Sequence, residues 1–175
     1  MHYCAMLLIR VTPPRPLVAP EGEALPAEWD LDVRPLVERC DVGAIGDVRQ
    51  VFGTCGGGAI RGIVHAAGVL SDGAVGNLSQ ADFERVYRPK VQGALHLQEC
   101  CTEEELEFFV LFSSIASGFG AAAQANYAAA NGALDDLAEE RAARGLKGLS
   151  VRWGAWRGGG MATDQTMERM GRVGV

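Results

Sequence analysis

The sequence predicts an α/β fold in which a parallel sheet carries helices on both faces. Three apolar segments have the length of strands, at residues 60–66, 107–112 and 149–153. The stretches 79–95 and 124–143, which separate them, have the patterns of helices. Strands alternating with helices of this length are typical of parallel sheets. Ligands of such sheets bind at the carboxyl ends of the strands, so we expect a site in the loops that follow these segments.

Length and composition are those of a globular chain. The 175 residues are 48% apolar and 22% charged, which excludes wholesale disorder. The net charge of −6 argues against a nucleic-acid partner, because non-specific binding to nucleic acid needs a basic face. No apolar run reaches the roughly 20 residues that span a bilayer. We therefore expect a cytoplasmic protein with neither a nucleic-acid nor a membrane partner.

The cysteines and histidines predict neither a disulfide framework nor a metal site. The five cysteines are odd in number and form no C-x-x-C pair. The histidines are His2, His65 and His96, and none is spaced to complete a metal site.

Residues 1–30 differ in composition and sequence pattern from the rest of the chain. An apolar start at 1–11 is expected to be a strand, and the prolines that follow predict a linker or surface loop at 12–28. From there on, 31–42 is expected to be a strand with an irregularity at Pro35, and 47–52 part of a short helix. We therefore divide the chain into an atypical proline-rich segment, 1–30, and a main region, 31–175.

The two longer helices have recognisable ends. Ser79-Gln80-Ala81-Asp82 resembles a capping box at the start of the first, and Pro89 is expected to kink that helix. Its apolar residues follow helical spacing: Phe83, Val86, Tyr87, Val91, Ala94 and Leu95. The second helix ends before Gly145, which stands where a glycine cap is expected.

Polar residues gather in the loops after the predicted strands and on the helices beside them. Tyr127 and Asn131 lie four residues apart, so they share one helix face. A tyrosine donates a proton at neutral pH only if its pKa falls from about 10, and the ammonium of Lys90 is the candidate to lower it. A serine hydroxyl would hold the carbonyl oxygen on which negative charge develops, so this set of residues suits carbonyl reduction.

Taken singly, these residues also have structural explanations. The alternatives are packing for Tyr127, a solvated side chain for Lys90, backbone support for Ser113, a strand-end role rather than a catalytic one for His65, a turn before Gly73 for Asp72, and core or cleft wall for Trp153 and Trp156.

Four phrases and their order resemble a known family. The phrases are His65-Ala66-Ala67-Gly68-Val69-Leu70, Phe112-Ser113-Ser114, Asn126-Tyr127-Ala128-Ala129-Ala130-Asn131 and Trp153-Gly154-Ala155-Trp156. Together with Lys90 in Arg88-Pro89-Lys90-Val91, they resemble the ketoreductase domains of modular polyketide synthases, in the short-chain dehydrogenase/reductase superfamily. The resemblance covers roughly residues 36–172 and implies a Rossmann-like sheet.

The resemblance implies catalytic roles for four residues. Tyr127 is the proton donor to the β-keto oxygen, and Ser114 hydrogen-bonds that oxygen. Lys90 lowers the pKa of Tyr127 and contacts the nicotinamide ribose, while Asn131 helps to organise a proton-relay water. Ordinary short-chain reductases have Lys at the position of Asn131; the lysine from the earlier helix is typical of the polyketide and fatty-acid synthase branch. A plain fatty-acid carrier-protein reductase would need Lys at 131, which disfavours it.

The resemblance also implies NADPH as cofactor and a β-ketoacyl chain on a phosphopantetheinyl acyl-carrier protein as substrate, with the other polyketide synthase domains as partners. Asp41 is expected near the adenine, and Gly68 lets the chain pass close to the cofactor. The implied cofactor-binding residues are Asp41, Val42, His65, Ala66, Ala67, Gly68, Lys90, Tyr127, Trp153 and Gly154. Those implied for substrate and stereocontrol are Leu70, Asp72, Phe119 and Trp156.

The expected product is the D-hydroxyl, or B-type, product. The family's Leu-Asp-Asp signature is present as Leu70-Ser71-Asp72, which retains the final acid. Phe119, rather than Trp, stands eight residues before Tyr127.

The family's glycine-rich NADPH turn is missing from the sequence, so we expect an incomplete sheet without the first β-α-β unit. The triplet 56–58 precedes its strand, which is the wrong order for a phosphate cradle. Gly118-x-Gly120-x-x-Ala123 matches a dinucleotide fingerprint but follows its strand too late, and is interpreted as a mobile active-site loop. Two hypotheses remain: a ketoreductase, or a non-catalytic ketoreductase-like fragment or pseudoenzyme with a scaffold role and no NADPH binding.

Overall fold

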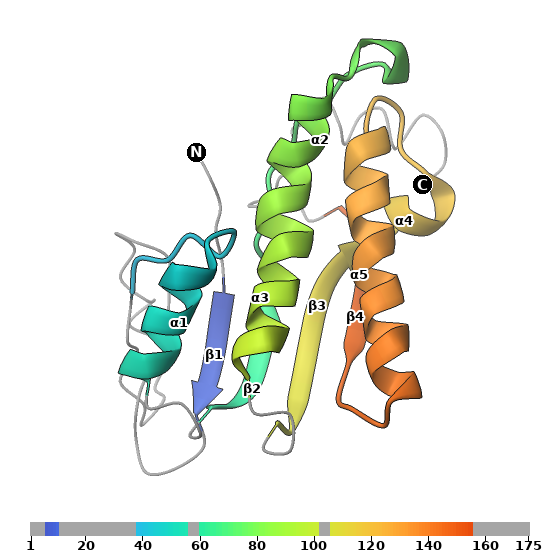
Figure 1. Cartoon of the computed structure of the whole chain (residues 1–175). Coiled ribbons are helices and arrows are strands. Elements are labelled where there is room, and N and C mark those ends of the chain that lie inside the picture. Colours follow the sequence, from blue (N-terminus) through green and yellow to red (C-terminus); the bar gives the residue numbers. More distant parts are fainter. Residues whose placement is uncertain (1–5, 11–37, 56–59, 102–105, 156–175) are drawn as a thin grey trace, which may run out of the picture.

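A four-stranded sheet organises the computed structural model, which describes residues 6–10, 38–55, 60–101 and 106–155. The strands are β1 (Met6–Arg10), β2 (Ile60–His65), β3 (Phe108–Ser114) and β4 (Leu149–Trp153), in the spatial order β1-β2-β3-β4. β2, β3 and β4 are parallel, which confirms the α/β prediction for these strands (Figure 1). The expected strand at the start of the chain is present, but β1 pairs with β2 in the antiparallel sense, so the sheet is not parallel throughout.

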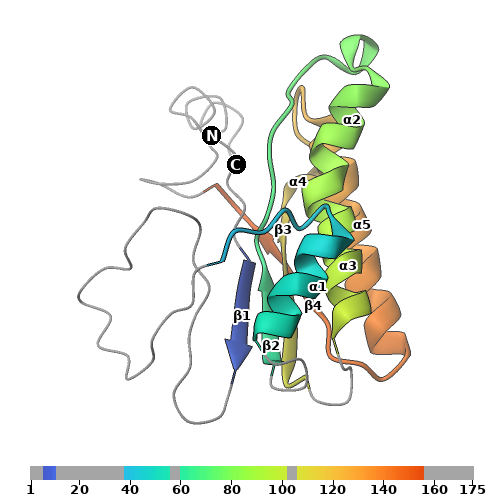
Figure 2. The same ribbon diagram turned by 60° about the vertical axis from the view of Figure 1, so that its left-hand side comes forward.

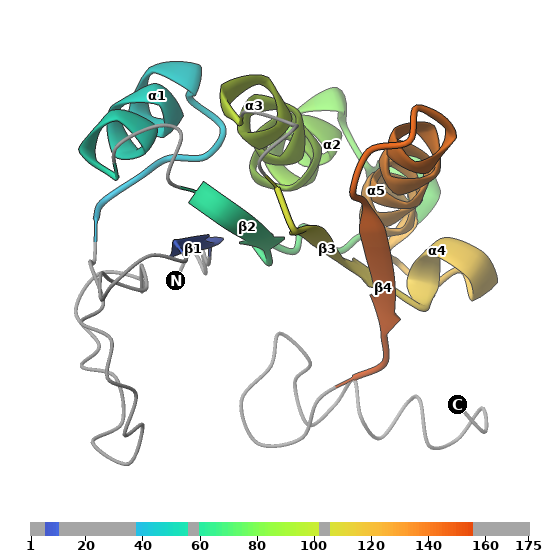
Figure 3. The same ribbon diagram turned by 90° about the horizontal axis from the view of Figure 1, so that it is seen from below.

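The described helices lie along one face of the sheet. They include α1 (Ile45–Thr54), the consecutive α2 (Gln80–Tyr87), η3 (Arg88–Gln92) and α3 (Gly93–Cys100), and the long α5 (Ala125–Ala143). Figures 2 and 3 show α1, α2–α3 and α5 side by side on this face. Two short elements, η2 (Val75–Asn77) and α4 (Ala116–Phe119), lie in the loops after β2 and β3. Helical cover of the second face stays a prediction.

The burial pattern of β3 reflects helices packed on one face of the sheet. In β3, Phe109, Leu111 and Ser113 are buried and alternate with half-buried neighbours. This alternation is that of a strand with one packed face. The register places His65 of β2 opposite Leu111, and Ser114 opposite Trp153 of β4, so the carboxyl ends of the three strands form one edge.

The strand expected at 31–42 is wrong for its described part. Residues 38–40 have no regular structure, and a turn follows at 41–44. The Oδ1 atom of Asp41 accepts the N–H of Gly43 at 2.9 Å, and the Asp41 carbonyl accepts that of Ala44 at 2.8 Å. A short carboxylate side chain that bonds to nearby backbone favours a turn over a strand ladder. Residues 31–37, including Pro35, lie outside the described ranges, as does the linker predicted at 12–28.

The helix after β2 begins and bends as expected. Ser79 and Asp82 form a reciprocal capping box. At Pro89 the helix widens into the π-helical turn η3, where the Gly93 N–H reaches the carbonyl of Arg88, five residues earlier. Proline lacks the N–H of a regular turn and its ring crowds the preceding carbonyl, which explains the irregularity. The sequence predicted a kink here without predicting its type.

The long helix α5 ends in a Schellman motif. Gly145 has a φ of 74°, and its N–H bonds to the Ala142 carbonyl at 3.0 Å. The Leu146 N–H bonds to the Arg141 carbonyl at 2.9 Å. This pair of bonds satisfies carbonyls that the helix end would leave open, and the positive φ explains why position 145 is glycine.

Among the helices that the structure describes, none combines the length and the apolar composition of a membrane span.

A buried arginine fastens α5 to the rest of the core. Arg141 is fully buried, donates from Nε to the Lys147 carbonyl and from Nη1 to Gln98 Oε1, both at 2.7 Å. Its guanidinium lies 4.3 Å from the ring centroid of Phe109. One side chain therefore links α5 to α3, to β3 and to the turn before β4. A guanidinium with these partners is a structural group.

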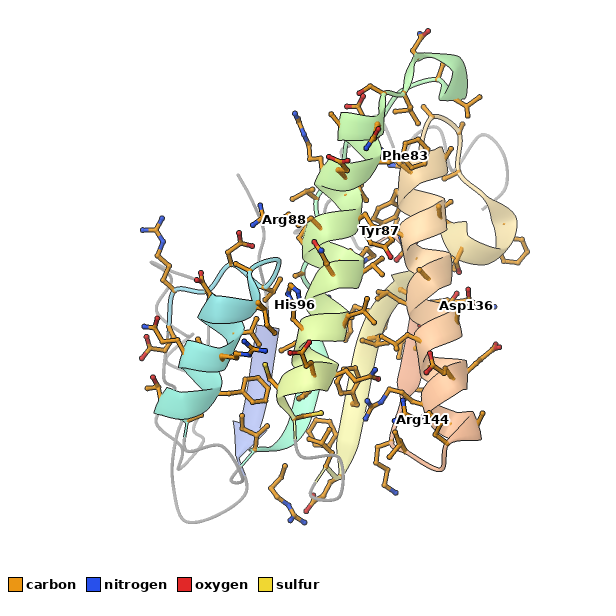
Figure 4. The ribbon with its side chains drawn as sticks, viewed as in Figure 1. Phe83, Tyr87, Arg88, His96, Asp136 and Arg144 are labelled. Atoms are coloured by element: carbon orange, nitrogen blue, oxygen red, sulfur yellow. The ribbon has the colours of Figure 1, made fainter. Side chains whose placement is uncertain are left out.

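We predict that Arg141→Ala lowers the free energy of unfolding by about 2–4 kcal/mol, because it leaves a cavity and two acceptors without their donor. Urea denaturation followed by circular dichroism measures the change. Arg144→Ala is the matched control: Arg144 stands on the exposed end of the same helix (Figure 4), where substitution is expected to change stability by no more than about 0.5 kcal/mol. Equal effects of the two substitutions would contradict the role of Arg141.

Candidate active site

The residues predicted for carbonyl chemistry meet at the carboxyl edge of the sheet. Ser114 is the last residue of β3, Tyr127 and Asn131 stand in the first turns of α5, and Lys90 lies on η3. Asn131 donates from Nδ2 to the Tyr127 carbonyl at 2.7 Å, as expected for residues on one helix face. The ammonium of Lys90 lies 5.4 Å from the centroid of the Tyr127 ring. The four side chains are therefore brought together from three elements.

The pKa of Tyr127 is raised, whereas the sequence predicted that it would be lowered. Burial raises the pKa of Tyr127, and hydrogen bonding with the side chains of Ser114 and Asn131 only partly offsets that rise. Burial acts in this direction because a phenolate is poorly stabilised away from water. The expected net lowering of the Tyr127 pKa is thus not found in this structure, because burial outweighs the groups that favour the phenolate.

Lys90 is an ammonium group inside the protein. The residue is 3% exposed, and its Nζ donates to the Phe112 carbonyl at 3.0 Å. Burial lowers the pKa of Lys90 to about 8, and the negative charge of Asp135 opposes this. Lys90 is therefore still protonated at neutral pH, although less firmly than a surface lysine.

Asp135 is a part of the site that the sequence reasoning missed. Ser150 donates from its hydroxyl to Oδ1 of Asp135, and Arg152 from Nε to Oδ2 at 2.8 Å. Burial raises the pKa of Asp135, but the hydrogen bonds it receives outweigh burial and bring the pKa below its ordinary value. The signal was available: Asp135 follows Asn131 by four residues, so Tyr127, Asn131 and Asp135 lie along one helix face.

Asn126 ties the start of α5 to the loop after β2. This residue is 2% exposed and donates from Nδ2 to the carbonyls of Ser71 and Asp82, at 2.8 and 3.1 Å. Its Oδ1 accepts the backbone N–H of Tyr127 at 2.8 Å. Asn126 thereby fixes the backbone that carries the tyrosine. It was part of a family phrase, but only the fold shows that its partners lie 44 and 55 residues away.

The loop predicted for substrate contact is held by the loop before α5. Gln124 donates from Nε2 to both carboxylate oxygens of Asp72 at 3.1 Å, and the Gly73 N–H bonds to the Ala123 carbonyl at 2.8 Å. Asp72 is thus more than a turn residue. Ala123 has a positive φ of 63°, a strained conformation for a residue with a Cβ.

Asp41 lies in a turn that η3 and α3 secure. Arg88 pairs with Oδ2 of Asp41 at 2.7 Å, and the His96 ring bonds through Nδ1 to the Val42 carbonyl at 2.9 Å. Arg88 and His96 point to the α1 side of their helix, whereas Tyr87 points to the α5 side (Figure 4). A Cβ on Gly43 would approach the Arg88 side chain to 2.7 Å, so a larger residue at position 43 would force Arg88 to shift within this ion pair.

The other predicted residues are distributed along the same edge. His65, Ala67 and Gly68 are buried and Ala66 half-buried; Leu70 is half-buried and Gly154 exposed. Trp153 is 38% exposed, with its ring centroid 5.3 Å from that of Phe112. Phe119 is 87% exposed and is not brought to the cluster around Tyr127 by any described contact. Trp156 lies outside the described residues.

Gly118-x-Gly120-x-x-Ala123 does not form a phosphate-binding turn. Gly118 is inside the short helix α4, which starts two residues after β3 ends, and Gly120 follows it with a φ of 72°. A dinucleotide fingerprint needs its first glycine directly between strand and helix. The segment is therefore a loop beside the site, as its late position in the sequence indicated; its mobility stays a prediction.

We predict that Lys90→Met stabilises the fold at pH 7 by about 1–3 kcal/mol, because it removes the cost of burying an ammonium. The unfolded-state pKa of 10.5 exceeds the folded-state pKa of about 8, so the unfolded chain binds more protons between these values. The cost is complete below pH 8 and falls as the pH rises towards 10.5. The groups that face Lys90 are Asp135, Tyr127 and His65.

Thermal unfolding at pH 7 and pH 9.5 measures this effect. The gain in Tm of the Lys90→Met protein should shrink at the higher pH. Lys147→Met, at the exposed lysine before β4, is the control and should change Tm little at either pH. An unchanged or lower Tm of Lys90→Met at pH 7 would show that Lys90 carries no such cost.

Comparison with known proteins shows which family this chain resembles. The family model described as "KR domain" matches residues 10–158. The chain is 52% identical over 105 residues to Polyketide synthase GfsA of Streptomyces halstedii, a match that covers 58% of this chain and 1% of that protein. It is 46% identical over 82 residues to Mellein synthase of Phaeosphaeria nodorum, covering 47% of this chain and 5% of that protein.

Solved ketoreductases have the same fold. PlmKR1, the ketoreductase from the first module of phoslactomycin biosynthesis in Streptomyces sp. HK803, matches with a TM-score of 0.73 and 37% identity, over 79% of this chain and 32% of that one. A-type ketoreductases from a modular polyketide synthase match with a TM-score of 0.75 and 37% identity, over 80% of this chain and 30% of that one. The chain thus spans about a third of the ketoreductases it resembles. It belongs to the ketoreductase domains of polyketide synthases, in the short-chain dehydrogenase/reductase superfamily.

Proposed function

We propose that this chain is the catalytic region of a ketoreductase that uses NADPH to reduce a β-ketoacyl thioester, carried by an acyl-carrier protein, to the β-hydroxyacyl form. The observation that carries the proposal is the convergence of Ser114, Tyr127, Asn131 and Lys90 at the carboxyl edge of the sheet. Reduction of a carbonyl needs donors where negative charge develops on oxygen, and the neighbouring hydroxyls of Ser114 and Tyr127 would supply them.

In the proposed reaction, the hydroxyls of Ser114 and Tyr127 hold the keto oxygen. Ser114 is oriented by the backbone N–H of Ala116, which donates to its Oγ at 3.2 Å. Tyr127 transfers its phenolic proton as the oxygen gains charge. The high pKa of the buried tyrosine keeps the proton in place until then, and hydrogen bonds from Ser114 and Asn131 stabilise the phenolate that remains.

Asn131 and Lys90 support the return of that proton. Oδ1 of Asn131 is buried without a hydrogen-bond partner among the described residues, which leaves it free to hold a relay water. The positive charge of Lys90, 5.4 Å from the Tyr127 ring centroid, favours the phenolate electrostatically once it forms.

The nicotinamide end of the cofactor site fits the residues present. An ammonium has three N–H donors, and one of those on Lys90 is used by the Phe112 carbonyl; the other two have no hydrogen-bond partner among residues 38–55, 60–101 and 106–155 and could bind ribose hydroxyls. When bound there, a reduced nicotinamide supplies the hydride that reduces the carbonyl. Asp41 keeps acceptor capacity for an adenine amino group beside its bonds to Gly43 and Arg88.

The part of the sheet where the cofactor diphosphate would bind supports a second candidate. In this candidate the chain resembles a ketoreductase but does not bind NADPH and acts as a scaffold. In a doubly wound sheet, the glycine-rich turn follows a strand whose carboxyl end lies at the ligand edge. β1 is antiparallel, with Met6 opposite His65 and Arg10 opposite Ile60, so its carboxyl end lies at the far edge. A turn directly after β1 would face away from Lys90 and Tyr127.

Substrate, partners and product stereochemistry follow as parts of the proposal. The loop 70–73, held by Asp72 and Gln124, is proposed to border the β-ketoacyl chain, with Leu70 and Phe119 as further contacts. The relatives are named as polyketide synthases, which favours the acyl-carrier protein and the other synthase domains as partners. The retained acid of Leu70-Ser71-Asp72 favours the D-hydroxyl product.

Titration with NADPH separates the two candidates. Binding to the folded chain should enhance NADPH fluorescence and raise Tm, because a ligand stabilises the state that binds it. Asp41→Ala should weaken that binding, whereas Asp136→Ala, on the exposed side of α5 (Figure 4), should not. A folded chain with neither response at millimolar NADPH would favour the scaffold.

Given binding, Tyr127→Phe tests the chemistry. The substitution removes one hydroxyl and should lower the kcat for reduction of a simple β-ketothioester at saturating NADPH by about 10²-fold or more. Absorbance at 340 nm follows the reaction. Tyr87→Phe, at a half-exposed tyrosine on α2, is the matched control and should retain turnover. Turnover by Tyr127→Phe at the wild-type rate would exclude the proposed proton donor.

A further inference from the structure

His65 occupies the carboxyl end of β2, directly beneath the π-helical turn that carries Lys90. The residue is 1% exposed, and its Nε2 lies 2.7 Å from the Lys90 carbonyl oxygen. A carbonyl oxygen only accepts, so Nε2 must carry the proton and His65 is the donor. Lys90 is thereby held at both ends, because β2 binds its carbonyl through His65 and β3 binds its ammonium through Phe112.

Lys90 lies in η3, where the regular hydrogen-bond pattern of the helix is interrupted. Pro89 has no N–H, and η3 replaces the regular helical pattern with a wider turn in which the Gly93 N–H is shared between the carbonyls of Arg88 and Lys90. A carbonyl oxygen has two lone pairs, so the Lys90 carbonyl can accept from His65 in addition to this shared N–H. At 2.7 Å, the contact with His65 Nε2 is short.

Gly93 leaves room for the imidazole ring of His65. A Cβ on Gly93 would lie 3.1 Å from Cε1 of His65 and 2.8 Å from Cγ2 of Val42, so glycine leaves the space that the ring occupies. Nδ1 of His65 is buried with no hydrogen-bond partner among the described residues, an unfavourable arrangement that an apolar side chain would avoid. Packing alone therefore does not explain a histidine here, whereas the bond to Lys90 does.

We propose that His65 is a positioning residue for Lys90: its Nε2–H holds the π-turn in the shape that directs the ammonium towards the Phe112 carbonyl and the Tyr127 ring. This extends the cofactor-contact role that the resemblance implied for His65. The inference deepens the proposed function and rests on it only for the consequence in catalysis. The placement of Lys90 itself is tested without cofactor or substrate.

Burial also keeps His65 in the neutral form, in which a single ring nitrogen carries the proton. Burial lowers the pKa of His65 to about 4, with a further small lowering by the charge of Lys90, against the raising effect of its bond to the Lys90 backbone. The charged and titratable groups near the pair are the ammonium of Lys90, Tyr127 and Asp135. His65 is thus expected to remain a neutral Nε2–H donor throughout the range in which a ketoreductase would operate.

The chain offers a direct readout, because Lys90 and Lys147 are its only lysines. In protein labelled with ¹³C-lysine, the Cε signals are followed against pH, and Lys147→Arg assigns them. His65→Leu removes the donor at similar volume, and the apparent pKa of Lys90 should rise by about one unit or more as the ammonium moves towards water. His65→Gln keeps an N–H donor and should return the titration to within about half a unit of wild type.

His96→Leu is the matched control. It also removes a bond from a histidine to a backbone carbonyl, that of Val42, one to two turns along the same helix, without contact to Lys90. The titration of Lys90 should not change in this variant even if stability falls. A folded His65→Leu protein with the wild-type Lys90 titration would overturn the proposal, as would an equal shift in His96→Leu.

The wild-type protein provides a test that needs no variant. Long-range ¹⁵N spectra distinguish the histidine tautomers: His65 should be protonated on Nε2 and His96, which donates from Nδ1, on Nδ1. An Nδ1–H tautomer for His65 would exclude its bond to Lys90 and sink the proposal even if His65→Leu did not fold.

Turnover separates this inference from the proposed function. Where the wild-type chain reduces a β-ketothioester, His65→Leu should lower kcat by about tenfold or more and His65→Gln should restore most of it. A wild-type chain without turnover would contradict the proposed function, while the lysine titration would still decide the role of His65. Unchanged kcat in a His65→Leu protein whose Lys90 titration has shifted would refute the catalytic consequence.

Discussion

The charge of Lys90, buried at the junction of two strands and a helix, is the constraint on which the rest of the site depends. An ammonium that is 3% exposed needs a hydrogen-bond acceptor and a compensating charge nearby. The Phe112 carbonyl is that acceptor, and Asp135 supplies the charge from α5. Asp135 is in turn held by Ser150 and Arg152 of β4, so the environment of this one lysine involves β3, β4 and α5.

Helix α5 presents this site along one line of its surface. Tyr127, Asn131 and Asp135 follow each other at intervals of four residues, which places them on one face. At its start the helix is fixed by Asn126, and near its end by Arg141. Both anchors are buried polar side chains whose hydrogen bonds reach segments distant in sequence. Local helix propensity does not set the position of Tyr127; long-range hydrogen bonds do.

The direction of the strands determines which parts of a cofactor site the described sheet can supply. β2, β3 and β4 run in the same direction, so the residues at their carboxyl ends converge beside Lys90. β1 runs in the opposite direction, and its carboxyl end is at the other edge of the sheet. Carbonyl chemistry and nicotinamide contact are therefore supported by the same three strands, whereas binding of a diphosphate needs a glycine-rich turn that β1 does not place at this edge.

Much of this arrangement could be predicted from the sequence, because it depends on local patterns. Apolar runs located β2, β3 and β4, the capping box located α2, and the i, i+4 spacing placed Tyr127 and Asn131 on one face. Short patterns with a strong local cause, such as the positive φ at Gly145, were equally legible. The expected strand at 31–42 is wrong in its described part, because the side chain of Asp41 bonds to its own turn, an outcome that apolar content alone did not reveal.

Only the tertiary structure decided the direction of β1, the partners of Asn126 and Asp135, and the bond between His65 and Lys90. A strand's direction depends on which neighbour it pairs with, and no local pattern encodes that choice. The pKa of Tyr127 also depended on the fold, because burial raised it where the sequence showed only a lysine that would lower it. The sequence thus determined which chemical groups are present and roughly where each lies along its element. Burial and long-range pairing determined their charge, their orientation and which of them meet.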